Sequence, residues 1–231
     1  MTTLLVSNST LFRRGYLDHV ADAIQTLFRG ARRIAFVPYA LFDREGYARK
    51  AEQRFAAMGL ELASVHRADD ARAAIAAADG IFIGGGNTFR LLDALYANRL
   101  IDAIRERVAG GVPYLGSSAG SIVAGPTIRT TKDMPIVQPP SFDALHLVSF
   151  QISPHYLDPD PDSTHMGETQ EERIAQFLEE NDRTVIGLRE GSFVECDERA
   201  AVLRGPFSAR VFRRGHEPVE AAPGTDLARF V

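Results

Sequence analysis

The chain has a single cysteine and no excess of basic residues, and both shortages exclude classes of protein. Cys196 alone cannot form an internal disulfide and leaves too few thiolates for a structural zinc site. The 26 Lys and Arg residues are outnumbered by 30 Asp and Glu, which gives a formal net charge of −4. Such a chain has no basic field to hold a phosphate backbone, so we expect no nucleic acid partner.

Long apolar runs are also missing. No run approaches the ~20 apolar residues that a membrane helix requires, and the arginines near the N-terminus follow the first apolar segment instead of preceding it. We therefore expect no membrane association and a cytoplasmic protein. What the chain does have is 45% hydrophobic residues over 231 positions, which is enough for a sizeable core.

Short apolar runs alternate with segments of helical period through the first half of the chain. The predicted strands are 3–8, 33–40, 61–66, 81–89 and 112–116, and the predicted helices are 15–30, 46–59, 71–80, 88–100 and 101–111. This alternation is typical of parallel βαβ units, and strands this apolar need cover on both faces. The sequence predicts an α/β fold with a doubly wound, mostly parallel sheet.

The pattern changes after residue 125. Proline-rich loops appear, one helix is predicted at 169–181, and the short strands 184–189, 192–196, 200–205 and 208–215 follow at close spacing. Closely spaced strands usually form hairpins. Nothing resembling a hinge separates the two halves, so we expect residues 1–231 to form a single domain.

The stretch "YLGSSAGSIVAG" contains the strongest chemical signal. Residues 116–120 match G-x-S-x-G, in which a strand turns sharply into a helix and the middle serine stands above the sheet. This register makes Ser118 the candidate nucleophile. Ser117 and Ser121 are better explained as residues of the turn and the first helical turn.

A serine hydroxyl needs a base, and His155 is the preferred candidate. It follows the strand-like segment "LVSFQIS", and open α/β sheets place their sites at the carboxyl ends of strands. His19 and His66 fit structural roles better. His146 and His165 remain alternatives.

A third group should orient the histidine. Glu190 follows a buried-looking strand, and Asp133 is the rival because it lies close in sequence to the elbow. Spacing alone does not choose between them. The glycines of "GGGNTF", with Gly86 at their end, and Ala119 could supply backbone N–H donors for an oxyanion.

Two other readings of these loops are disfavoured. A nucleotide-binding G-x-G-x-x-G would need glycine where Phe89 stands. The loop "HYLDPDPDSTH" begins like a calcium loop, but Ser163 and Thr169 stand where glycine and glutamate are required. We predict no metal and no cofactor.

Six motifs occur in the order "GGGNTF", "GSSAGS", "TIRTTKDMPIV", "SPHYLD", "GETQEERI" and "VIGLREG". In these motifs the chain resembles serine peptidase family S51, the α-aspartyl dipeptidases, over nearly its whole length. The resemblance implies a fold similar to class I glutamine amidotransferases (flavodoxin-like). It also implies cofactor-free cleavage of dipeptides that begin with aspartate, and a homodimer.

The resemblance assigns roles to several positions. It makes Ser118 the nucleophile and His155 the base, and it implicates both Glu190 and Asp133. We expect Glu190 to complete the triad and Asp133 to support the site or to bind the amino group of the substrate.

Three further residues, Asn87, Gln170 and Arg189, are expected to bind substrate. Gln170 departs from the family's usual GETR motif, and an arginine there would pair naturally with an aspartyl carboxylate. Arg189 and Arg173 are candidates to replace it. The alternative functions are a related hydrolase with relaxed or different specificity, and a non-catalytic ligand-binding protein.

Overall fold

The computed structural model describes residues 2–164 and 166–231. The strands of its first half are β1 (Thr3–Val6), β2 (Ile34–Val37), β3 (Leu62–Ser64), β4 (Gly80–Ile83) and β5 (Tyr114–Ser117). The helices of that half are α1 (Ala21–Leu27), α2 (Arg44–Ala57), α3 (Ala71–Ala76), α4 (Thr88–Ala97), α5 (Leu100–Ala109) and α6 (Ala119–Ala124). The second half contains α7 (Gln170–Glu180) and the strands β6 (Gln151–Pro154), β7 (Val185–Leu188), β8 (Phe193–Cys196), β9 (Ala201–Arg204), β10 (Ala209–Phe212) and β11 (Val219–Ala221).

A seven-stranded sheet forms the larger part of the molecule, in the order β3-β2-β4-β5-β1-β8-β9. Its first five strands are parallel, β8 pairs antiparallel with β1, and β9 pairs antiparallel with β8 at the edge of the sheet. Successive side chains of β2 point to opposite faces of the sheet, and their packing shows which helices cover each face. Ile34 and Phe36 pack into the cluster that also holds α2 residues, whereas Ala35 and Val37 pack into the cluster that holds α4 and α5 residues. The predicted doubly wound, mostly parallel α/β sheet is confirmed.

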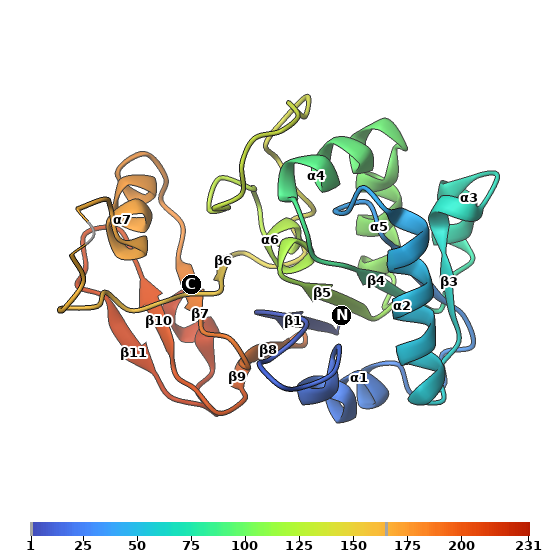
Figure 1. Cartoon of the computed structure of the whole chain (residues 1–231), viewed down its shortest axis with the longest axis horizontal. Coiled ribbons are helices and arrows are strands. Elements are labelled where there is room, and N and C mark those ends of the chain that lie inside the picture. The colour runs from blue at the N-terminus through green and yellow to red at the C-terminus, as the bar shows by residue number, and fades with distance from the viewer. Residues whose placement is uncertain (1, 165) are drawn as a thin grey trace.

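A second sheet has four strands in the order β11-β10-β7-β6. Strands β6 and β7 are parallel, whereas β10 is antiparallel to both β7 and β11. Figure 1 shows this sheet to one side of the larger one, with β6 in yellow, the other three strands in orange to red, and α7 beside it. The short strands of the second half therefore divide between two sheets, which their close spacing in sequence did not indicate.

One predicted helix is much shorter than its pattern. Helical period extends over 15–30, but α1 begins at Ala21 after a 3-10 turn at Asp18–Val20. Leu17 has φ 57°, in the left-handed region, so the chain cannot run helically through it. Gly30, with φ 84°, lies just beyond the helix as predicted for a glycine stop.

The core supports treating residues 1–231 as one domain, which we propose. A single apolar cluster includes Leu5 and Ile83 of the large sheet together with Ile152, Ile186 and Val211 of the small one. In the described part of the chain, no helix is both long and apolar enough to cross a membrane.

Helix α6 approaches β4 so closely that its second residue must be glycine. A Cβ added at Gly120 would collide with the carbonyl oxygen of Ile83. We expect Gly120→Ala to destabilise the protein by about 1–3 kcal/mol, because this overlap is with backbone and outweighs alanine's helix propensity. Urea unfolding measures the change.

The matched control for this substitution is Gly110→Ala. Gly110 has φ −74° and its Cβ would meet only carbonyls at 3.3 Å. Relative to the wild type, the free energy of unfolding should change less in Gly110→Ala than in Gly120→Ala. Equal stability of the Gly120 variant and the wild type would contradict the close approach.

Candidate active site

The elbow is a sharp connection between β5 and α6. Ser118 lies between them with φ 52° and ψ −110°, and its N–H donates to the carbonyl of Val6 at 3.0 Å. Such a conformation is costly for a residue with a side chain and persists only where its surroundings enforce it. A Cβ on Gly116 would lie 2.5 Å from the carbonyl oxygen of Gly120, so the turn closes only around small residues.

The structure brings Ser118, His155 and Glu190 together. Ser118 Oγ lies 2.9 Å from His155 Nε2, and His155 Nδ1 lies 2.7 Å from Glu190 Oε1. A carboxylate at Nδ1 accepts its N–H, which leaves the lone pair of Nε2 facing the serine hydroxyl. The three groups are therefore arranged for proton transfer from serine to histidine.

The histidine–glutamate pair is half exposed. The side chains of His155 and Glu190 retain 41% and 50% of their accessible surface. A side-chain pair this open to solvent contributes little to stability. Its effect is to fix the tautomer and the orientation of the imidazole.

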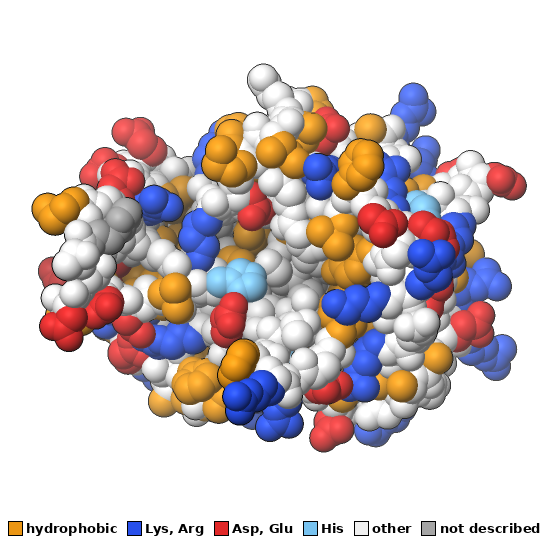
Figure 2. Space-filling model, in the orientation of Figure 1, with side chains coloured by type: hydrophobic (Ala, Val, Ile, Leu, Met, Phe, Trp, Pro, Cys, Tyr) orange, Lys and Arg blue, Asp and Glu red, His pale blue; other side chains and the backbone are white. Residues whose placement is uncertain are grey.

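The site forms where the two sheets meet. Ser118 follows β5 of the large sheet, whereas His155 follows β6 and Glu190 lies just beyond β7 of the small sheet. The three residues lie at the carboxyl ends of these strands, as the sequence predicted. Figure 2 shows a hollow in the middle of this face, with a histidine at its edge and acidic and basic side chains around it.

Ser7 connects the two sheets and was missed by the sequence analysis. Its buried hydroxyl donates to the carbonyl of Leu188 at 2.7 Å and accepts the backbone N–H of His155 at 2.9 Å. His155 has φ 52°, so this bond holds a strained residue in place. No local pattern marks Ser7, because both partners lie far away in the sequence.

Asn8 holds the turn that carries Glu190. Gly191, the next residue, has φ 88°, and its N–H donates to Asn8 Oδ1 at 2.8 Å. The turn that presents Glu190 is thus tied to the end of β1.

The loop after β4 supplies a free backbone donor beside Ser118. Gly85 packs against this serine, since its Cβ would lie 3.0 Å from that of Ser118, and its N–H donates to the hydroxyl of Tyr47 at 2.9 Å. The next N–H, of Gly86, has no acceptor among the described residues. Ala119 is the first residue of α6, so its N–H has no partner within the helix. These two groups fit an oxyanion site.

Asp133 does not contact His155. Its Oδ2 accepts bonds from the N–H of Thr88 at 2.7 Å, the hydroxyl of Thr88 at 2.6 Å and the hydroxyl of Thr131 at 3.1 Å. Asn87 caps α4 through its Oδ1, and its Nδ2 donates to the carbonyl of Met134 at 2.8 Å. Together Asp133 and Asn87 fasten the loop around Met134 to the start of α4, directly after Gly86.

Gln170 braces the backbone that carries the histidine. Its Nε2 donates to the carbonyl of His155 at 3.2 Å, and its Oε1 accepts from the N–H of Leu157 and from Lys132 Nζ, both at 3.1 Å. An arginine could not accept either bond.

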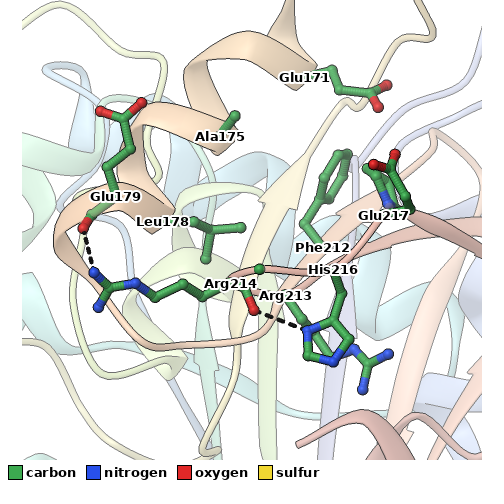
Figure 3. Close-up of a pocket in the computed structure, with 11 residues that line it drawn as sticks. Glu171, Ala175, Leu178, Glu179, Phe212, Arg213, Arg214, His216 and Glu217 are labelled. Atoms are coloured by element: carbon green, nitrogen blue, oxygen red, sulfur yellow. Dashed lines mark hydrogen bonds between the residues drawn. The ribbon is translucent and has the colours of Figure 1, made fainter.

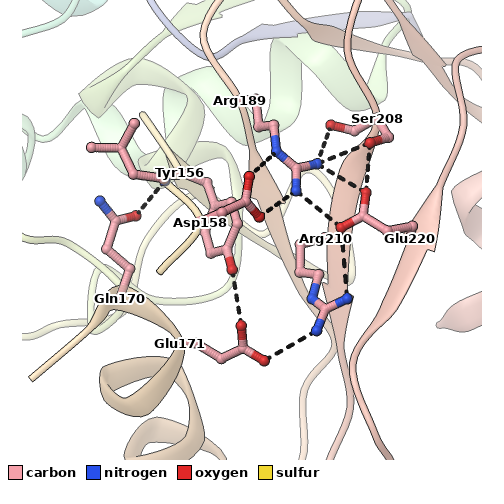
Figure 4. Close-up of polar contacts among 9 residues, drawn as sticks. Tyr156, Asp158, Gln170, Glu171, Arg189, Ser208, Arg210 and Glu220 are labelled. Carbon is pink, nitrogen blue, oxygen red and sulfur yellow. Dashed lines mark hydrogen bonds and ion pairs between the residues drawn. The ribbon is translucent and has the colours of Figure 1, made fainter. Parts of the chain in front are cut away.

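Arg189 is bound by two carboxylates outside the triad. Its guanidinium donates to Asp158 at 2.9 Å and to Glu220 at 2.9 and 3.0 Å, and Figure 4 shows it between these two carboxylates. Hydrogen bonds from Arg189 lower the pKa of Asp158. A substrate contact would require breaking this network, so Arg189 is not part of the site that we propose.

None of the other described histidines forms a hydrogen bond with Ser118. His216 lines a hollow of about 640 Å³ between α7 and the β10–β11 connection, where its Nδ1 bonds the carbonyl of Arg214 (Figure 3). None of the predicted site residues lines this hollow. His165 lies outside the described residues. Among the residues that are described, no three His, Cys, Asp or Glu side chains are grouped to hold a metal ion.

A serine on a strand-to-helix elbow, a histidine, a carboxylate and free N–H groups define a serine hydrolase arrangement. The comparisons with known proteins agree with this class. The sequence model of peptidase family S51 matches residues 3–204, and the chain belongs to this family.

Curated relatives resemble the whole chain. Peptidase E of Streptomyces coelicolor is 52% identical over 231 residues, covering 100% of this chain and 95% of the relative. A probable alpha-aspartyl dipeptidase of Drosophila melanogaster is 44% identical over 227 residues, covering 97% and 95%.

Solved structures support the fold at lower identity. A peptidase from an acI-B1 actinobacterium superposes with a TM-score of 0.72 at 17% identity, covering 97% of this chain and 95% of that one. A putative peptidase E protein from Listeria monocytogenes EGD-e superposes with a TM-score of 0.67 at 21% identity, covering 89% and 98%.

We expect Ser7→Ala to lower kcat about tenfold or more while leaving KM nearly unchanged. The variant leaves the N–H of His155 without its acceptor and loosens the base, but removes nothing that would hold a substrate. Steady-state kinetics on a dipeptide measure the split. A rise in KM with constant kcat would contradict a positioning role.

We expect Glu190→Gln to lower kcat by at least about 100-fold, because an amide can stabilise the wrong histidine tautomer and cannot balance the imidazolium charge. Unfolding in urea should be almost unaffected, since the pair is half exposed. Unchanged kcat would exclude Glu190 as the orienting acid and return Asp133 to consideration.

Proposed function

We propose that the protein is a serine dipeptidase that hydrolyses Asp-X dipeptides through an acyl-enzyme on Ser118. The observation that carries the proposal is the continuous hydrogen-bonded chain Ser118–His155–Glu190 on a strained elbow. Relatives over the full length of the chain are called peptidase E and alpha-aspartyl dipeptidase, which supports aspartate at the N-terminus of the substrate.

His155 removes the proton of the Ser118 hydroxyl as Oγ bonds to the carbonyl carbon of the peptide. The N–H groups of Gly86 and Ala119 stabilise the oxyanion of the tetrahedral intermediate. As the intermediate collapses, the C–N bond breaks and His155 gives its proton to the departing amine. Glu190 keeps the imidazole oriented and balances its positive charge throughout.

Water then completes the cycle. His155 takes a proton from a water molecule, which attacks the ester carbon, and the second intermediate releases an amino acid with a free carboxylate. Ser118 recovers its proton from His155. No cofactor is required for either half of the reaction.

Asp133 and Asn87 act on the oxyanion loop in this proposal. Both tie the segment around Met134 to the start of α4, next to Gly86. They hold the loop that carries the donor, and the proposal requires no proton transfer from either residue. A homodimer and a cytoplasmic location stay predictions.

We expect Ser118→Ala to abolish hydrolysis of Asp-Leu with little change in far-UV circular dichroism. Alanine lacks the attacking oxygen but fits the same space. A serine-directed phosphonate should add one adduct mass to the wild type and to the control Ser149→Ala, but none to Ser118→Ala.

Two results would redirect the proposal. Full activity of Ser118→Ala would exclude the acyl-enzyme mechanism. A phosphonate adduct on Ser118 without hydrolysis of Asp-Leu, Asn-Leu or Ala-Leu would keep the nucleophile but point to a hydrolase of other specificity.

A further inference from the structure

Lys132 lies beside the proposed base, on the loop that leads to Asp133. Its Nζ donates to the carbonyls of Pro154 and His155, at 2.6 and 3.1 Å, and to Oε1 of Gln170 at 3.1 Å. The chain has only two lysines among its 26 basic residues, and the other, Lys50, lies on α2 over the ring of Tyr16. A compact ammonium group therefore occupies the site in a chain that otherwise relies on arginine.

All three acceptors of this ammonium group are neutral. Lys132 forms no ion pair with any described residue. The neighbouring carboxylate, Asp133, has its Oδ2 engaged by Thr88 and Thr131. A cation in this position is solvated by dipoles but is not neutralised by a direct partner, which leaves it free to attract an anion.

The surroundings penalise the charge. The pKa of Lys132 is lowered to about 8, chiefly by burial and also by Arg173, while the charges of Asp133 and Glu190 oppose this shift. These are the charged groups that act on the ammonium from the flanking loop, from α7 and from the turn after β7. A carboxylate bound directly to Nζ would reverse the effect of burial.

A small cavity adjoins this group. It measures about 80 Å³ and is lined by Lys132, Gln170, Ser153, Thr130, Thr131, Arg129 and Arg173, with Ile174 and Phe177 at its apolar side. No acidic residue lines it. Arg173 pairs with Glu168 at 3.6 Å and Arg129 lies over the ring of Phe142, so Lys132 is the lining cation that has no direct ion pair or cation–π contact with a described residue.

We propose that Lys132, together with the amide of Gln170, recognises the acidic side chain of the substrate. The inference rests on the proposed function. A substrate carboxylate replaces one of the neutral acceptors of the ammonium, and the hydroxyl-lined cavity leaves room for it. Lys132 then supplies the positive charge that Gln170 lacks.

The proposal separates charge from shape. Asp-Leu and Asn-Leu have nearly the same size, but only the first has a carboxylate to pair with the ammonium. We expect Lys132→Met to lower kcat/KM for Asp-Leu about 10- to 100-fold more than for Asn-Leu or Ala-Leu. Lys132→Arg should retain much of the preference for Asp-Leu. Lys50→Met is the control and should change no ratio.

The preference should also depend on pH. kcat/KM reports groups of the free enzyme, so the ratio of Asp-Leu to Ala-Leu hydrolysis should fall as the pH rises through about 8, where Lys132 loses its proton. In Lys132→Met the ratio should be flat over the same range. Groups that act equally on the hydrolysis of both substrates cancel in the ratio.

A second measurement is independent of turnover. In the Ser118→Ala variant, Asp-Leu should protect Lys132 from acetylation by acetic anhydride, whereas Ala-Leu should not. Mass spectrometry measures the acetylation of Lys132, and Lys50 in the same molecule serves as the internal reference. Equal protection by both dipeptides would overturn the proposal.

The kinetic outcomes distinguish this inference from the proposed function. If Lys132→Met lowers kcat/KM equally for all three dipeptides, Lys132 only positions the backbone of His155. That result would overturn the inference but not the proposed dipeptidase function. If the wild type cleaves none of the three, the proposed function fails first.

Discussion

The hydrogen bond between Ser118 and His155 joins residues presented by two different sheets, and the geometry of the site depends on holding those sheets in register. Ser7 provides that register with one buried hydroxyl, which bonds the end of β7 and the backbone of the histidine. Because the hydroxyl both donates and accepts, neither partner is left unpaired in the interior. The relative position of Ser118 and His155 therefore depends on a side chain that belongs to neither residue.

The two residues joined by this hydrogen bond both have a strained backbone. Ser118 and His155 both have φ 52°, and each is held by backbone contacts on either side. Val6 fixes one, and Ser7, Lys132 and Gln170 fix the other. Strained residues remain ordered when the surrounding bonds over-determine them, and they lose little freedom when the reaction begins. The glycines at 116 and 120 make the first of these turns sterically accessible.

The sequence predicted those parts of the site that carry a local signature. The elbow was recognised because small residues at fixed spacing close a strained turn. His155 and Glu190 were candidates because they follow apolar strands, and the family resemblance favoured Glu190 over Asp133 as the acid of the triad. Ser7, Asn8 and Lys132 were missed because their roles come from partners distant in the sequence. The four-stranded sheet was missed for the same reason, since the pairing of short strands depends on tertiary packing. Arg189 was predicted to bind substrate because it lies next to Glu190 in the sequence. In the structure its guanidinium is paired with two carboxylates from other segments.

The order of the chain has a consequence for its synthesis. The nucleophile and the oxyanion loop lie in the first 120 residues, whereas the base and its acid follow more than thirty residues later, on strands of the second sheet. A chain emerging from the ribosome can thus form the parallel core and the elbow before any group exists to activate the serine. The strands that carry His155 and Glu190 must dock beside β5 before these residues can reach Ser118, and the bond from Ser7 to Leu188 belongs to that docked arrangement. In the proposed mechanism, the serine therefore has no base until the second half of the chain has folded against the first.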